Sequence, residues 1–107
     1  MDHGYEVGDV VWVHYPHQED PDTTKLRPAV IVEISEDELF VLVKITKTDR
    51  SRKNEGRFID INSPEAEMMG LTVSSFINYE QSVSLPLFAL EEWMGTCPFI
   101  EEIKRYL

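Results

Sequence analysis

The feature that most constrains the fold is a series of short runs rich in β-branched and aromatic residues, separated by polar segments. Runs of this length and composition favour β-strands. The runs lie at residues 8–15, 28–34, 39–46 and 57–61, and residues 71–73, 75–79 and 83–85 can also be strands. Many short strands in 107 residues predict a single domain over residues 1–107, built on a strongly bent antiparallel sheet or a small barrel.

Two segments carry helix signals. Residues 62–70 start with Asn-Ser-Pro and end in glycine, which is typical of a short capped helical turn or a loop. Further along, apolar residues fall at helical spacing over 87–94 and again over 99–107. These patterns predict a short helical turn and then a C-terminal helix packed on the sheet, so the expected fold class is mainly β with minor α.

The charge is unevenly distributed. The formal net charge is -10, yet eight of the ten lysines and arginines lie between Lys25 and Arg57. Backbone phosphates favour basic surfaces, so the net charge argues against a nucleic-acid partner while the basic segment argues for one. This distribution fits a small anion-binding face on an acidic body, or a charged hairpin.

Several classes of protein are excluded by what the sequence lacks. No apolar run approaches the ~20 residues that a membrane span needs, and the N-terminal residues have no signal-peptide pattern. Cys97 is the only cysteine, and the sequence has no GxGxxG, P-loop, HExxH or DxDxDG motif. We therefore expect a cytoplasmic protein that needs no metal and no cofactor and has no membrane partner.

Arg27 stands one residue before Pro28, at the entrance to an apolar strand. One interpretation is that its charge closes off the strand end and pairs with the acids of residues 17–22 or 35–38. The other is that the rigid segment holds a cation at the rim of a groove, where a planar guanidinium can bind an anion.

Four segments, in this order and spacing, form a recognisable pattern. They are G-D-V-V-W-V at 8–13, R-P-A-V-I-V at 27–32, V-L-V-K-I-T at 41–46 and E-Q at 80–81. Together they make the chain resemble the MazF/PemK family of bacterial toxins from type II toxin–antitoxin pairs, over roughly residues 5 to 90.

The resemblance implies a small twisted antiparallel SH3-like barrel of the MazF/CcdB type. It also implies a homodimeric endoribonuclease, an mRNA interferase, that cuts single-stranded RNA without a metal and is held by a cognate antitoxin. The products would carry a 2′,3′-cyclic phosphate and a 5′-hydroxyl. The matching catalytic positions are Arg27 and Thr46, and Glu80 matches a position that is acidic in many members.

The same residues suit this chemistry on physical grounds. Attack by the 2′-hydroxyl needs a base, an acid and donors that stabilise the charge on the phosphorane. Arg27 can give two hydrogen bonds to one phosphate, and the stiff β-branched Thr46 can add a hydroxyl donor, unless it is an ordinary strand residue. Candidate acid and base groups are Glu80, if neighbouring aromatic rings desolvate it, and His14 and His17. The two histidines are three apart on a predicted strand, so they face opposite sides, which argues against a metal pair.

Further residues are candidates for RNA binding. The cations are Lys25, Lys44, Lys47, Arg50, Arg52 and Lys53; the aromatic residues are Tyr15, Tyr79 and Phe76; and Gln81 completes the set. Aromatic rings can stack on unpaired bases. Alternatively, the basic residues 47–53 form a solvated hairpin tip, and Phe76 is a core or interface residue.

Asn78 departs from the family pattern, because some members have an arginine two residues before the acid. Together with the acidic composition, this leaves alternatives open. The chain can be a weak or inactive MazF-like barrel that acts as a binding module, either poisoning gyrase or docking a protein.

Overall fold

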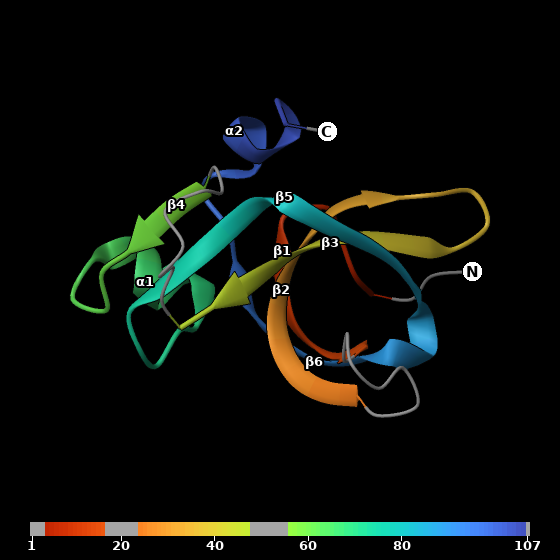
Figure 1. Cartoon of the computed structure of the whole chain (residues 1–107), viewed down its shortest axis with the longest axis horizontal. Coiled ribbons are helices and arrows are strands. Elements are labelled where there is room, and N and C mark those ends of the chain that lie inside the picture. The colour runs from red at the N-terminus through yellow and green to blue at the C-terminus, as the bar shows by residue number, and fades with distance from the viewer. Residues whose placement is uncertain (1–3, 17–23, 48–55, 107) are drawn as a thin grey trace.

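The computed structural model describes residues 4–16, 24–47 and 56–106. Its elements are β1 (Asp9–Pro16), β2 (Thr24–Ile34), β3 (Leu39–Thr46), β4 (Gly56–Ile59), α1 (Pro64–Met69), β5 (Ser75–Pro86), the 3₁₀ turn η1 (Leu87–Ala89), β6 (Leu90–Thr96) and α2 (Ile100–Lys104) (Figure 1). Among these residues, no helix has both the length and the apolar character needed to cross a bilayer.

The six strands form one antiparallel sheet in the order β4-β5-β3-β2-β1-β6. The long strands β2 and β5 bend strongly across the molecule (Figure 1), and register shifts interrupt the β1–β6, β2–β3 and β3–β5 ladders. Such irregularities increase local twist and let a sheet curl. The described strands leave β4 and β6 at the two edges, so the sheet is barrel-like but open. The predicted fold class, mainly β with a twisted antiparallel barrel-like sheet, is confirmed.

Alternation along the strands gives the sheet two apolar faces, each with its own core. One core contains Val10, Val30, Val43, Ile45, Ile59 and Ile77 and is joined by Ala66 and Met69 of α1 and Ile103 of α2. The other contains Val11, Val13, Ala29, Ile31, Phe40, Leu42 and Leu85. Successive side chains point to opposite faces of a strand, so neighbours such as Val10 and Val11 belong to different cores.

The helix signals at residues 62–70 produce α1. The Ser63 hydroxyl accepts a hydrogen bond from the Ala66 backbone N–H at 3.2 Å, and Pro64 occupies the first turn. Gly70 ends the helix in the left-handed region, at φ 73°. A Cβ at Gly95 of β6 would lie 2.2 Å from the Met68 carbonyl oxygen, so this glycine lets α1 pack directly on β6.

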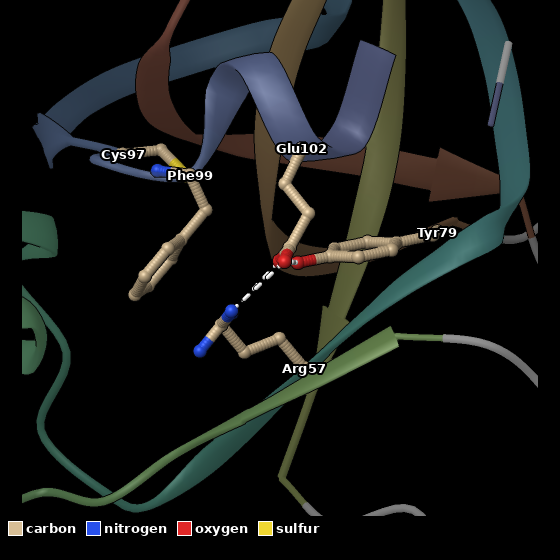
Figure 2. Close-up of polar contacts among 5 residues, drawn as sticks. All are labelled: Arg57, Tyr79, Cys97, Phe99 and Glu102. Atoms are coloured by element: carbon tan, nitrogen blue, oxygen red, sulfur yellow. Dashed lines mark hydrogen bonds and ion pairs between the residues drawn. The ribbon is translucent and has the colours of Figure 1, made fainter. Parts of the chain in front are cut away.

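The helix α2 is fastened to the sheet by a polar network (Figure 2). Arg57 donates two hydrogen bonds to the Glu102 carboxylate, and the Tyr79 hydroxyl donates a third. The Arg57 guanidinium also lies 4.3 Å from the centre of the Phe99 ring. Nearby, burial raises the pKa of the Cys97 thiol to about 11, so this thiol stays protonated at neutral pH. The predicted C-terminal helix is therefore present and packs on the sheet.

The structure differs from the predicted elements in three places. The apolar spacing over 87–94 predicted a helical turn, but only Leu87–Ala89 form one and Leu90–Thr96 form the edge strand β6. The side chains of the predicted stripe do not share a face, because Leu90 is buried whereas Leu87 and Trp93 are exposed. Residues 71–73 form no strand, and the two short strands expected over 75–85 are one continuous strand, β5.

Candidate functional site

A cavity of about 370 Å³ opens where the central strands β2 and β3 part. The last β2–β3 pair is Ala29 with Lys44, and beyond it β2 curves away from the end of β3 (Figure 1). The cavity is lined by residues 26–28 of β2 and 45–47 at the end of β3, together with Trp12, Leu71, Thr72, Val73, Ser75 and Met94. Its position follows from the separation of these two strand ends, which pair with β1 and β5 but not with each other. Pro28 contributes to this, because proline offers no N–H to a ladder.

Arg27 and Thr46 both line this cavity, which we call the Arg27–Thr46 cavity. The β2–β3 register, continued by two residues beyond Ala29 and Lys44, would set Arg27 opposite Thr46. The ladder ends before this pair, so the two residues share the space between the parted strands instead of a ladder position. The Thr46 hydroxyl lies 3.5 Å from the Phe76 carbonyl oxygen, to which it donates. Arg27 is half-buried and forms no ion pair with the carboxylates of the described residues.

Arg27 belongs to a cluster of three cations, Lys25, Arg27 and Lys44, which we call the cationic cluster. Burial lowers the pKa of Lys44, and the charges of Arg27 and Lys25 lower it further. The Lys44 ammonium lies 5.5 Å from the centre of the Tyr15 ring, and burial raises the pKa of the Tyr15 hydroxyl to about 12. Like charges held together beside a cavity favour an anion that offsets their repulsion.

The candidate proton-transfer groups lie elsewhere. Glu80 is exposed in the part of β5 where the ladder with β3 is irregular, and its backbone N–H bonds to Asn78. The His14 Nε2 atom lies 2.5 Å from a carboxylate oxygen of Glu91 on β6. Neither residue is among the described residues that line the Arg27–Thr46 cavity. The structure therefore joins only two of the three predicted catalytic residues.

Tyr79 does not fit the predicted role in base stacking. Its side chain is only 2% exposed, its hydroxyl bonds to Glu102, and its ring packs against Tyr106. Burial, followed by the bond to Glu102, raises its pKa. Tyr79 is thus a core residue that anchors α2. The sequence could not reveal this, because its partners come from the C-terminal helix.

The remaining candidates differ in how far the structure describes them. Lys47 lines the cavity and is exposed. Gln81 lies within β5, and nothing is described of its side chain. His17, Arg50, Arg52 and Lys53 lie outside the described residues.

The other residues that line the cavity were not predicted. They are Trp12, the segment 71–73, Ser75 and Met94. Met94 is placed there by β6, and segment 71–73 follows directly after the cap of α1. No local signal marks these residues, because pairing of β1 with β2 brings Trp12 to the cavity and packing of α1 on β6 brings the others.

No group of three or more His, Cys, Asp or Glu side chains in the described ranges is arranged to hold a metal ion. A family model described as PemK-like, MazF-like toxin of type II toxin-antitoxin system matches residues 6–102. The chain belongs to this toxin family. The resemblance seen in the sequence is thereby confirmed, and it extends over nearly the whole chain.

Membership of the PemK-like, MazF-like toxins has direct consequences. A type II toxin is paired with an antitoxin, and toxins of this family are generally endoribonucleases. Among curated proteins, none matches this chain closely enough to count as a relative. The assignment of individual residues in this toxin therefore depends on its own structure.

Proposed function

We propose that this toxin is a metal-independent endoribonuclease that cleaves single-stranded RNA at the Arg27–Thr46 cavity. The observation that carries the proposal is that Arg27 and Thr46, predicted separately from two strands, line the same cavity. The toxin would act in the cytoplasm as a homodimer and be held inactive by its antitoxin.

In this reaction the ribose 2′-hydroxyl loses its proton and its oxygen attacks the adjacent phosphorus, while the bond from phosphorus to the 5′-oxygen breaks and that oxygen takes up a proton. The products are a 2′,3′-cyclic phosphate and a 5′-hydroxyl. Arg27 keeps its charge throughout and stabilises the extra negative charge on the phosphorane through its planar donors. The Thr46 hydroxyl, which donates to the Phe76 carbonyl oxygen in the free protein, would turn its proton to the phosphate and add a donor from the neighbouring strand. The chain's contribution is therefore the stabilisation of charge by groups fixed before the substrate arrives.

The cationic cluster supports an anionic polymer as substrate. Lys25 is exposed and Lys44 half-buried, and Lys44 is within electrostatic reach of both Lys25 and Arg27. Tyr15, opposite Lys25 in the β1–β2 ladder, adds a half-buried ring beside these charges. Phosphates on either side of the cleaved linkage would interact with these cations, which accounts for RNA binding by a chain of net charge -10.

The test is cleavage of a long single-stranded RNA by the purified full chain in the presence of EDTA. We expect fragments whose 5′ ends accept phosphate from a polynucleotide kinase without prior phosphatase treatment and whose 3′ ends are cyclic phosphates. RNA that stays intact after prolonged incubation, or products with 5′-phosphates, would overturn the proposal.

A second candidate function is favoured by one observation. None of the described residues that line the cavity is a histidine, aspartate or glutamate. A barrel without a group to move protons can bind without cleaving, as a gyrase-poison-like or protein-binding module. Under this alternative, induced expression arrests bacterial growth equally in the wild type and in Arg27→Ala, with cellular RNA intact.

A further inference from the structure

A row of side chains runs from the Arg27–Thr46 cavity to the edge of the sheet. Thr46 of β3 lies opposite Phe76 of β5, and Phe76 lies opposite Phe58 of β4. Side chains opposite each other in antiparallel strands share a face. Thr46, Phe76 and Phe58 therefore project to the same face, at the same level of the three neighbouring strands β3, β5 and β4.

The outermost ring of this row is exposed. Phe58 is 58% exposed, although its neighbours Arg57 and Ile59 are engaged on the opposite face, with Glu102 and with the core. Phe76 is half-buried. Single exposed apolar residues are common and need no explanation. A pair of phenylalanines in register with a candidate catalytic residue is a more specific arrangement.

The backbone of β4 holds the Phe76 ring in place. A Cβ at Gly56 would lie 2.4 Å from Cζ and 2.7 Å from Cε2 of Phe76, so the ring packs directly over this glycine. Gly56 and Phe58 are two residues apart on one strand and face the same side. The Phe76 ring thus packs over Gly56, and Phe58, two residues further along β4, projects to the same face as Phe76.

We propose that Phe58 and Phe76 form a stacking platform for a nucleobase of the single-stranded RNA, next to the cleaved linkage. This inference rests on the proposed function. Neighbouring strands are ~4.8 Å apart, which puts Phe76 one strand and Phe58 two strands from the Thr46 hydroxyl. Stacking on aromatic rings is a common way to hold unpaired bases.

Charge favours RNA over a protein as the occupant of this platform. The row begins at Thr46, which lines the cavity together with Arg27. Lys47, the residue after Thr46, is exposed. A polymer with one phosphate and one base per unit matches this order of groups, with cations and donors at one end and aromatic rings at the other. The platform would therefore orient the substrate so that its phosphate meets Arg27 and Thr46.

The experiment measures binding of a single-stranded RNA that spans a mapped cleavage site and carries a 2′-deoxyribose at the cleaved nucleotide. Phe58→Ala should weaken binding by about 5- to 30-fold, as expected for the loss of one stacked base. Phe58→Trp should restore it, because a larger ring still stacks. Phe88→Ala is the matched control, since Phe88 is 86% exposed but lies on η1, away from this row.

A second arm identifies the ligand as a base. An RNA that lacks the base beside the cleaved linkage should bind the wild type as weakly as the full RNA binds Phe58→Ala. The Phe58→Ala variant should bind the full RNA and the RNA that lacks this base with equal affinity. One result would overturn the platform. In it, Phe58→Ala binds each abasic RNA more weakly than the wild type by the same factor, wherever the missing base lies, and light scattering shows a changed oligomeric state. A second copy of the chain would then cover Phe58.

The remaining outcomes separate the platform from the proposed function. If the wild type cleaves RNA and Phe58→Ala binds normally, the platform is wrong and the nuclease stands. If the wild type neither binds nor cleaves single-stranded RNA, the nuclease is wrong and the platform is rejected with it.

Discussion

Arg57 of β4 and Glu102 of α2 are joined by two hydrogen bonds of 2.8 and 2.9 Å. The same carboxylate accepts a bond from Tyr79 of β5, so one side chain ties the C-terminal helix to two strands. A bidentate contact with arginine is the strongest form of such a pair. α2 itself is only five residues long. A helix this short has little stability of its own, so its position depends on contacts with the sheet.

The first prediction concerns this contact and pH. Bonds from Arg57 and then Tyr79 lower the pKa of Glu102 from 4.5 to about 2. A carboxylate whose pKa is lower in the folded state stabilises that state above its unfolded pKa and loses the contribution as pH falls. The free energy of unfolding should therefore fall between about pH 4.5 and 2. Because Glu102 is partly exposed, Glu102→Gln should destabilise by only about 1 kcal/mol at pH 7 and flatten this dependence.

Urea titrations at pH 7, 4 and 3 measure this effect. Glu101→Gln is the matched control, because Glu101 is an exposed acid on the same helix. An equal pH dependence in both variants would show that Glu102 is not responsible.

The second prediction concerns Arg27. Arg27→Ala should reduce the rate of RNA cleavage by ~10²–10³, the usual effect of removing one preorganised donor to a developing negative charge. Arg27→Lys should retain part of the rate, because it keeps the charge but not the planar fork. Single-turnover assays measure the rates. Arg105→Ala, at the end of α2, controls for loss of an arginine, and a cleavage rate for Arg27→Ala within a factor of two of wild type would exclude the proposed role.

The third prediction separates the hydroxyl of Thr46 from its shape. Thr46→Val keeps the branched side chain and removes the donor, so we expect a rate loss of ~10² or more with little change in RNA affinity. Thr46→Ser keeps the donor but frees χ1, so its loss should be smaller. Cleavage by Thr46→Val at the wild-type rate would show that the Thr46 hydroxyl has no role in catalysis.

The fourth prediction concerns the salt dependence of RNA binding. Each phosphate contact with a single strand adds ~0.7 to the slope of log affinity against log salt concentration. Lys25→Gln and Lys44→Gln should each lower the slope by about this amount, whereas Lys104→Gln on α2 should leave it unchanged. Anisotropy titrations with the non-cleavable RNA measure the slope. A slope that is the same in all three variants would place the phosphates away from the cationic cluster.

Local signals were sufficient for much of the fold. The β-branched runs predicted β1 to β4, and the Ser63, Pro64 and Gly70 signals indicated a short helical turn or a loop, of which the structure has the helix, α1. Strand β6 was missed because register shifts against β1 break its alternation, while its apolar residues happen to fall at helical spacing. Without knowledge of the partner strand, the sequence alone cannot distinguish the two-residue repeat of a strand from the helical repeat of about 3.6 residues.

The candidate site could likewise be predicted only in part from the sequence. Arg27 and Thr46 sit in recognisable local contexts, the R-P step and the end of an apolar strand. Other residues that line the cavity have no such local context, since Trp12 and Met94 reach it only through the path of β1 and β6. The wrong prediction for Tyr79 has the same origin, because its burial depends on α2.

The parting of β2 and β3 beyond Ala29 and Lys44 leaves two central strands without mutual hydrogen bonds at one end. Continuing that ladder would make a tighter sheet and would fill the space that Arg27 and Thr46 now share. We therefore expect variants that extend this pairing to gain heat resistance and to lose the space that the proposed cleavage needs.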